Sequence, residues 1–246
     1  MELEVIGSGS SGNCYILRGE DESIVLEAGA SFKEFTRAIG DGLRNVRACL
    51  VSHEHGDHAA NVGKFLSYSV PVYMSAGTAS AIDTGGSSFL RLCAAGKQFK
   101  VGGFTVLPFG TRHDAVEPLG FLISHQECGV VLFATDTYYL PCRFSGLNNV
   151  MIECNYITDV LEERVKSGDL HPSVARRVRR SHMELQTCID ALGANDLTSC
   201  RNIVLVHISG GNGDPERMRE EVVRATGINT VCAAKGVTVD FSITPF

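Results

Sequence analysis

The sequence predicts an α/β fold in which two β-sheets pack face to face with helices on their outer surfaces. In both halves of the chain, short apolar runs rich in β-branched residues alternate with amphipathic helical patterns. Apolar residues make up 44% of the chain, which is enough for a sizeable core. No linker, repeat or low-complexity tract interrupts the 246 residues. We therefore expect a single domain over residues 1–246.

The first half should open with an antiparallel meander. Its strands are expected at 2–7, 13–18 and 23–27, separated by glycine-rich or charged turns. A helix should follow, because Ser31 can cap it with Glu34 three residues later. The apolar run at 48–51 predicts a buried strand, and apolar spacing predicts a helix over 59–68. Further strands are expected at 71–74, 98–101, 104–108, 119–124 and 130–134.

The second half repeats this alternation. A strand is expected at 150–153 and another at 203–207. Pro172 favours the first position of a helix. The other helices of this half are expected at 158–166, 184–192 and 215–226. A closing pair of strands is expected at 229–232 and 237–241.

Four potential metal ligands follow the strand at 48–51 within six residues. The segment reads His53-Glu54-His55-Gly56-Asp57-His58. Three more candidates stand where a predicted strand passes into a loop, which is where functional sites are usually built. These are His113, Asp136 and His207. A lone histidine at such a position is more often structural, but a four-ligand cluster needs partners.

The number of donors predicts two divalent ions. Imidazoles with a bridging carboxylate suit zinc, with manganese or iron as alternatives. One ion would be held by His53, His55 and His113. The other would be held by Asp57, His58 and His207, with Asp136 bridging the two. The remaining charge, about +1, suits a phosphodiester monoanion.

A glycine-rich segment near the N-terminus matches the dinucleotide-binding pattern. It reads Gly7-Ser8-Gly9-Ser10-Ser11-Gly12 and follows a strand. That pattern requires a helix immediately afterwards, whereas 13–17 reads as a strand. Two interpretations remain: a hairpin turn, or a loop whose backbone N–H groups lie near a substrate phosphate. Under the second, Ser10 and Asn13 are expected substrate contacts, together with Ser209 beyond the histidine of the 203–207 strand.

Other histidines and one basic cluster are open to two interpretations. His182 is either an N-terminal helix residue or a proton donor beside the metals. His125 and His171 lie in turn-like segments and are expected at the surface. The four arginines of 176–180 are either a solvated helix face or a rim that steers phosphates.

Composition limits the partners. A net charge of −6 and a pI near 5.7 argue against a long nucleic-acid substrate, which needs many Lys and Arg contacts. No leader is apparent and no apolar stretch approaches the ~20 residues that span a bilayer. The nine cysteines show no metal-binding or redox spacing, so we expect free thiols. These features predict a soluble protein of the bacterial cytoplasm or, if phage-encoded, of the infected host's.

The motif His-x-His-x-Asp-His at 53–58, followed by His113, Asp136 and His207 in that order, resembles the signature of the metallo-β-lactamase fold. The resemblance spans nearly the whole chain and implies a four-layer αββα sandwich. The opening Gly-Ser-rich segment, Glu153-Cys154-Asn155 and Ser181-His182 are most similar to the YycJ and RNase Z branch of phosphodiesterases. In RNase Z relatives the histidine matching His182 assists the leaving group. Glu27 stands where an Asp commonly orients the first metal ligands. Its side chain is one methylene longer, which could change the position of the ligand segment 53–58.

A narrower resemblance concerns the substrate. The segments 26–29, 133–139, 151–156 and 181–183 resemble the phage-associated anti-Pycsar proteins, which destroy cyclic mononucleotide signals. The chain has neither the tRNA-binding arm of RNase Z nor the inserted domain of RNase J. The missing arm and domain and the acidic net charge both favour a small substrate over a long nucleic acid. The resemblance also implies a homodimer.

The leading hypothesis is therefore a dinuclear phosphodiesterase that hydrolyses small cyclic nucleotides by means of a metal-bridging hydroxide. Asp57 and His182 are the expected catalytic residues, with His182 protonating the leaving oxygen. The alternative is a YycJ-type nuclease acting on DNA or RNA, with the arginines of 176–180 along the backbone. A third class, a binding module that only sequesters a nucleotide, fits poorly with a complete ligand set.

Overall fold

The first β-sheet joins the N-terminal strands to the end of the chain. The computed structural model describes residues 1–243. In spatial order the strands of this sheet are β14 (Thr238–Asp240), β1 (Glu2–Gly7), β2 (Cys14–Arg18), β3 (Ser23–Leu26), β4 (Val46–Leu50), β5 (Val72–Met74) and β6 (Leu90–Leu92). Strands β1 to β3 form the predicted antiparallel meander, and β3 to β6 continue in parallel.

The second sheet also has seven strands. In spatial order they are β13 (Asn229–Cys232), β12 (Asn202–Val206), β11 (Asn149–Glu153), β10 (Gly129–Ala134), β9 (Leu119–His125), β8 (Phe104–Gly110) and β7 (Phe99–Val101). Strands β10 to β13 run parallel, and β7 to β10 are antiparallel. Strand β8 therefore points the same way as β10, β11 and β12, so their carboxyl ends meet at one edge.

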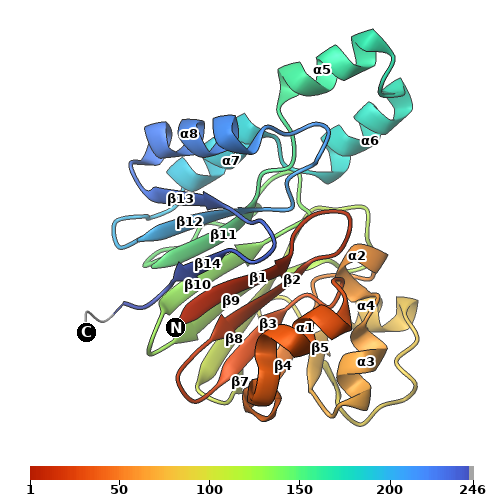
Figure 1. The fold of residues 1–246 in the computed structure, drawn as a ribbon, viewed down its shortest axis with the longest axis vertical. Helices are drawn as coiled ribbons and strands as arrows, with labels where there is room; N and C mark the ends of the chain where they lie inside the picture. The colour runs from red at the N-terminus through yellow and green to blue at the C-terminus, as the bar shows by residue number, and fades with distance from the viewer. Residues whose placement is uncertain (244–246) are drawn as a thin grey trace.

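Helices cover the outer face of each sheet, as Figure 1 shows. Those on the side of the first sheet are α1 (Phe32–Ile39), α2 (Gly56–Ala59), α3 (Val62–Ser67) and α4 (Ala76–Ala81), with a 3₁₀ turn at Gly40–Asn45. On the second sheet lie α7 (Leu185–Gly193) and α8 (Pro215–Thr226). Helices α5 (Thr158–Ser167) and α6 (Pro172–Ser181) project from the body as a pair (Figure 1). The predicted αββα arrangement is confirmed.

Alternation along the strands sorts side chains between layers. In β2, Tyr15 and Leu17 belong to the core between the sheets, whereas Ile16 faces the core beneath α1 and α3. This follows from the two-residue period of a strand. Strands β11 and β12 are buried along their whole length, because one face meets the other sheet and the opposite face meets α7 and α8.

Several sequence expectations need correction. The helix predicted over 59–68 is the shorter α3, and a separate turn, α2, precedes it. The strands predicted as a closing pair belong to different sheets, β13 to the second and β14 to the first. Ser31 occupies the N-cap position of α1, yet its side chain makes no capping hydrogen bond. Helix α4 and strand β6 are too short to have shown a period.

His125 is buried rather than exposed. Its ring stacks on Phe104, and its Nε2 lies 3.2 Å from Glu22 Oε1. The turn that follows it in the sequence belongs to the β9–β10 hairpin, and the ring packs back onto β8. Burial alone would raise the pKa of Glu22, but hydrogen bonds from Gly103, Arg47 and His125 lower it overall. His171 is exposed as expected and caps α6, with its Nδ1 accepting from Ser173 N.

Two further expectations concern the whole chain. The nine cysteines are free thiols. Among residues 1–243, no helix has both the length and the apolar character needed to cross a membrane.

Candidate metal centre

The predicted ligands gather at one edge of the two sheets. The segment 53–58 follows β4 and leads into α2. His113, Asp136 and His207 follow β8, β10 and β12, whose carboxyl ends lie together. Ligands separated by up to 150 residues along the chain therefore come into contact, as between Asp57 and His207.

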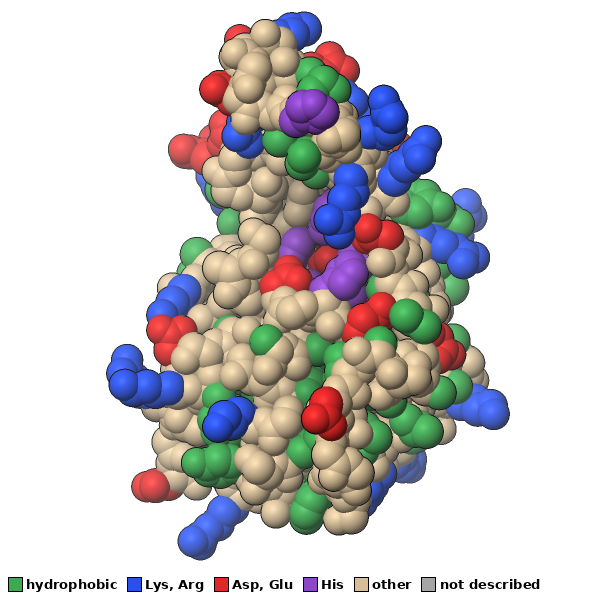
Figure 2. All heavy atoms as spheres, turned by 90° about the vertical axis from the view of Figure 1, so that its right-hand side faces the viewer, with side chains coloured by type: hydrophobic (Ala, Val, Ile, Leu, Met, Phe, Trp, Pro, Cys, Tyr) green, Lys and Arg blue, Asp and Glu red, His purple; other side chains and the backbone are tan. Residues whose placement is uncertain are grey.

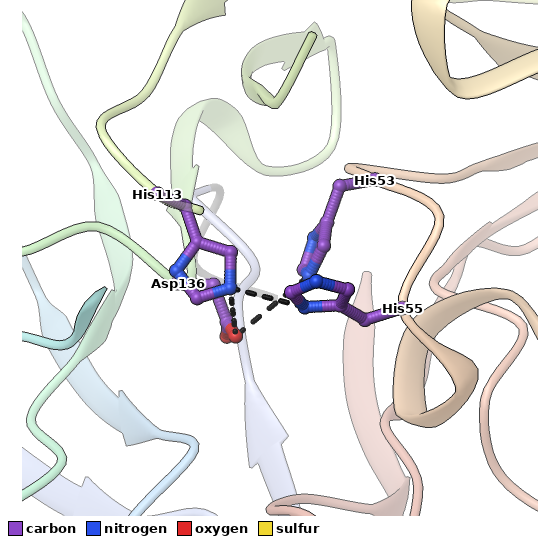
Figure 3. A group of neighbouring side chains, drawn as sticks. All are labelled: His53, His55, His113 and Asp136. Carbon is purple, nitrogen blue, oxygen red and sulfur yellow. Dashed lines mark hydrogen bonds and ion pairs between the residues drawn. The ribbon is translucent and has the colours of Figure 1, made fainter. Parts of the chain in front are cut away.

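The first group of ligands consists of His53, His55, His113 and Asp136. Figure 3 shows the four side chains pointing toward one another, with His53 and His55 from one loop and the other two from separate loops. One donor atom from each lies within 4.8 Å of the others. His55 Nδ1 is 3.2 Å from His113 Nε2, which is in turn 3.3 Å from Asp136 Oδ2. This group contains the three histidines predicted for the first ion.

The second group consists of Asp57, His58 and His207. Asp57 Oδ2 lies 3.1 Å from His207 Nε2 and 3.4 Å from His58 Nε2. Asp136 connects the two groups, because its Oδ1 is 3.3 Å from His58 Nε2. Its position between them is the one expected of a bridging carboxylate.

Backbone and neighbouring groups fix these ligands in place. His113 Nδ1 donates to the carbonyl of Ser181 over 2.7 Å, which leaves Nε2 for a metal. Glu27 Oε2 lies 3.4 Å from His58 Nδ1, so the longer side chain still reaches the ligand loop. Glu27 and the ligands Asp136 and His207 all have positive φ angles, of 66°, 45° and 54°. Such strained backbone in non-glycine residues is concentrated at functional sites.

The chemistry of the site fits divalent metal ions. His53 Nε2 is buried and has no hydrogen-bond partner among residues 1–243, yet it faces Asp136 at 3.8 Å. A buried nitrogen without a partner is costly unless a ligand binds it. Burial, and then the neighbouring His58, lower the pKa of His53, which favours the neutral ring that coordinates metals. The histidine and aspartate cluster therefore fits a dinuclear metal centre.

A histidine–glutamate pair adjoins the centre. His182 Nδ1 lies 2.6 Å from Glu153 Oε1, and Glu153 is fully buried at the end of β11. The backbone N–H groups of Thr137 and Met183 donate to the other oxygen of Glu153. Burial alone would lower the pKa of His182, but the Glu153 carboxylate raises it overall. The contact fits an Nδ1–H that donates to Glu153, so that Nε2 can carry a second proton.

A cavity of about 270 Å³ opens onto these residues. Its lining combines metal-ligand candidates with side chains of α6: Ser10, His55, Asp57, His113, Asp136, Val174, Arg177, Val178, His182 and His207. Figure 2 shows histidine and acidic side chains in a hollow between the projecting upper part of the molecule and its body, with basic side chains at the rim.

A family model described as a β-lactamase superfamily domain matches residues 23–208, a span that includes every candidate ligand. The chain belongs to the β-lactamase superfamily. It is accordingly a metal-dependent hydrolase with the metallo-β-lactamase fold. This outcome confirms the fold and the enzyme class that the motif predicts.

Relatives within the superfamily are nucleases by name. The chain is 27% identical to the exodeoxyribonuclease WalJ of Streptococcus pneumoniae, over 98% of this chain and 93% of the relative. It is 28% identical to the exodeoxyribonuclease YycJ of Bacillus anthracis (90% and 88%) and 23% identical to a ribonuclease Z of Mycobacterium bovis (85% and 94%). The fold matches that of YhfI from Bacillus subtilis, with a TM-score of 0.75, 16% identity and coverage of 97% and 99%. These likenesses support the YycJ and RNase Z branch.

The residues expected to bind substrate lie in different environments. Ser10 lines the cavity, in a loop that connects two antiparallel strands. Asn13 is fully buried and does not line it. Its Nδ2 donates to the carbonyls of Gly9 and Asp57, so it joins the glycine-rich loop to the ligand loop. Ser209 also lies outside the cavity lining, where its Oγ accepts from Asn212 N.

Sequence reasoning gave no role to some residues of the site, and it named Glu153 only within the resemblance to the YycJ and RNase Z branch. Glu153 ends an apolar strand as Asp136 does, so the argument that selected Asp136 would have found it. Val174 and Val178 gave no signal, because apolar residues of a helix usually face a core. Of the four arginines in 176–180, Arg177 lines the cavity, whereas Arg179 pairs with Glu162 on α5. The cluster is therefore divided between the cavity lining and the surface of the α5–α6 pair.

Proposed function

We propose that this protein is a nuclease that hydrolyses the terminal phosphodiester bond of DNA or RNA strands. The observation that carries the proposal is the convergence of seven metal-ligand candidates, five of which line one cavity together with His182, the partner of Glu153. The relatives named as exodeoxyribonucleases and ribonuclease Z support a phosphodiester substrate.

The residues divide the chemical work between them. When bound, two divalent ions lower the pKa of water and stabilise the negative charge that develops on phosphoryl oxygens. The first ion would be held by His53, His55, His113 and Asp136, and the second by Asp57, His58, His207 and Asp136. His182 donates a proton to the departing sugar oxygen, while Glu153 holds its ring in orientation and stabilises its charged form.

The size of the cavity favours a strand end over the middle of a strand. At about 270 Å³ it lies just below the usual range of small-molecule pockets, about 300–1,000 Å³. The relatives WalJ and YycJ, which are named as exodeoxyribonucleases, also support a strand end. Arg177 also lines the cavity, where its guanidinium pairs with Asp114.

Labelled linear and circular single strands test this proposal. We expect the metal-loaded protein to release mononucleotides from linear DNA or RNA and to leave circular DNA intact. Asp136→Asn serves as the inactive control, because it removes the charge shared by both groups of ligands. If the loaded protein cleaves circles as fast as linear strands, the preference for ends is wrong; if it cleaves neither, the nuclease proposal fails.

A second candidate is the hydrolysis of cyclic mononucleotides. It is favoured by the same small cavity together with the net charge of −6, which weakens polymer binding. Incubation of the same preparation with cyclic mononucleotides separates the two candidates. Opening of the cyclic ring with intact linear strands would favour this candidate, and the reverse result would exclude it.

A further inference from the structure

The side of helix α6 that faces the metal centre carries apolar side chains. Val174 and Val178 are one helical turn apart, and both line the cavity that contains His113 and Asp136. Val174 is 46% exposed, which makes it one of the more exposed apolar side chains among residues 1–243. Helices α5 and α6 pack together chiefly through Leu161 and Ala175, with Val178 packed against them, and Val174 takes no part in this core. Val174 is therefore available to a molecule in the cavity.

Two contacts hold α6 at a fixed place over the centre. Near its middle, Arg177 Nε donates to Asp114 Oδ2 over 3.1 Å, beside the ligand candidate His113. At its C-terminal end, the carbonyl of Ser181 accepts from His113 Nδ1. Because both contacts involve the same loop, the two valines keep a defined position relative to the metal ligands.

The cavity is thus divided by chemistry. Histidines and carboxylates that suit cations and a phosphate line one part of it, whereas α6 contributes Arg177 and two apolar side chains, Val174 and Val178. A nucleotide has the same division, with a charged phosphate joined to a sugar and a base whose faces are apolar. An inorganic or simple alkyl phosphate would leave the two valines in water, at a cost proportional to their area.

We propose that Val174 and Val178 form the wall against which the nucleoside of the substrate packs while its phosphate lies at the metal centre. This inference rests on the proposed phosphodiesterase function and adds the residues that select nucleotide esters over other phosphate esters. Val174 is the more informative of the two, because Val178 also packs against the small core between α5 and α6.

A pair of substrates with the same leaving group tests the wall. The p-nitrophenyl ester of thymidine 5′-phosphate carries a nucleoside, and methyl p-nitrophenyl phosphate does not. We expect Val174→Ser to lower kcat/KM for the thymidine ester about tenfold, mainly through KM, the low end for loss of an apolar contact in a substrate pocket. The Val174→Ser variant should hydrolyse the methyl ester as fast as the wild type does. Val174→Ile, which keeps an apolar side chain, should keep the wild-type preference for the thymidine ester.

Val116→Ser is the matched control. Val116 is a 64% exposed valine in the loop after His113, and its side chain does not line the cavity. We expect this variant to hydrolyse both esters like the wild type. If Val116→Ser and Val174→Ser lower kcat/KM for the thymidine ester equally, the inference is wrong.

The outcomes separate the inference from the proposed function. If the metal-loaded wild type hydrolyses neither ester, the proposed function fails and the inference with it. If it hydrolyses both and Val174→Ser leaves their ratio unchanged, the inference alone is wrong. The inference is also wrong if Val174→Ser changes only the oligomeric mass in size-exclusion chromatography, since α6 would then be an interface between copies.

Discussion

At the scale of single residues, several metal-ligand candidates depend on a second contact. His113 is oriented by a carbonyl on α6, and His58 by the carboxylate of Glu27. Asp136 and His207 adopt positive φ angles that cost free energy and that the surrounding contacts must maintain. The chemistry of the site is therefore built from pairs of residues, of which the sequence motif shows only one member.

His182→Ala tests the separation of proton transfer from metal binding. We expect kcat to fall about 10²- to 10⁴-fold, the usual contribution of a general acid, with two metal ions still bound. Metal content by elemental analysis and steady-state kinetics with a phosphodiester measure the two effects. Loss of metal would instead make His182 a ligand, a role that its proximity to Asp136, Glu153 and His207 also permits.

Glu153→Gln is the companion variant. Glutamine keeps the shape of Glu153 but loses the charge that stabilises protonated His182. If the two residues act as one unit, the double variant should be no slower than His182→Ala alone, because effects within a unit are not additive. Fully additive losses would show that they act independently.

At the scale of elements, the site depends on how closely one loop approaches another. Gly29, between β3 and α1, lies against the start of α2: a Cβ placed on it would be 1.7 Å from the carbonyl oxygen of Asp57. Only glycine permits that approach. The segment 53–58 is therefore positioned by the neighbouring connection as well as by its own helix.

Gly29→Ala should displace this ligand loop. We expect the purified protein to bind less than its normal complement of metal and to lose activity in proportion, because Asp57 and His58 move together. Gly63→Ala is the matched control, since Gly63 lies in α3 with open space where a Cβ would be. Normal metal content in Gly29→Ala would mean that the loop adjusts without cost.

Sequence patterns predicted long elements better than short ones. The strands with clear alternation, such as β1 and β8, and helices with clear start signals, such as α6 and α8, lie within a few residues of their predicted positions. Helix α4 and strand β6 span about one period and gave no signal. The helix predicted over 59–68 begins only at Val62, because the ligand candidates Asp57 and His58 belong to a separate turn, α2, that ends at Ala59.

At the scale of the whole molecule, the metal centre joins the two sheets. The loop after β4 of the first sheet and the helix α2 that follows it carry His53, His55, Asp57 and His58, whereas the remaining candidates follow strands of the second sheet. Metal bound there would link both halves of the fold. Bound ligand stabilises a folded protein in proportion to the logarithm of its concentration over Kd.

Removal of metal should therefore destabilise the protein reversibly. At a metal concentration of 100 times Kd, binding contributes about 2.7 kcal/mol, which corresponds to a shift in Tm of about 5–10 °C for a chain of this size. Differential scanning fluorimetry with chelator, and then with excess zinc or manganese, measures the shift. An unchanged Tm in a preparation shown to lose its metal would contradict the role of the centre as a link.

The order of most elements and the ligand motif at 53–58 could be predicted from the amino-acid sequence alone, because short spacing and strand ends are local features of the chain. His113 and His207 needed the further argument that a cluster requires partners. Three relations became visible only in the folded chain: Glu153 pairs with His182, Asn13 is buried, and α6 forms a cavity wall. Each of these three observations depends on contacts between segments that are far apart in the sequence. Local patterns report which face of an element is buried, whereas the packing of two sheets and a helical pair sets the distances between their ends.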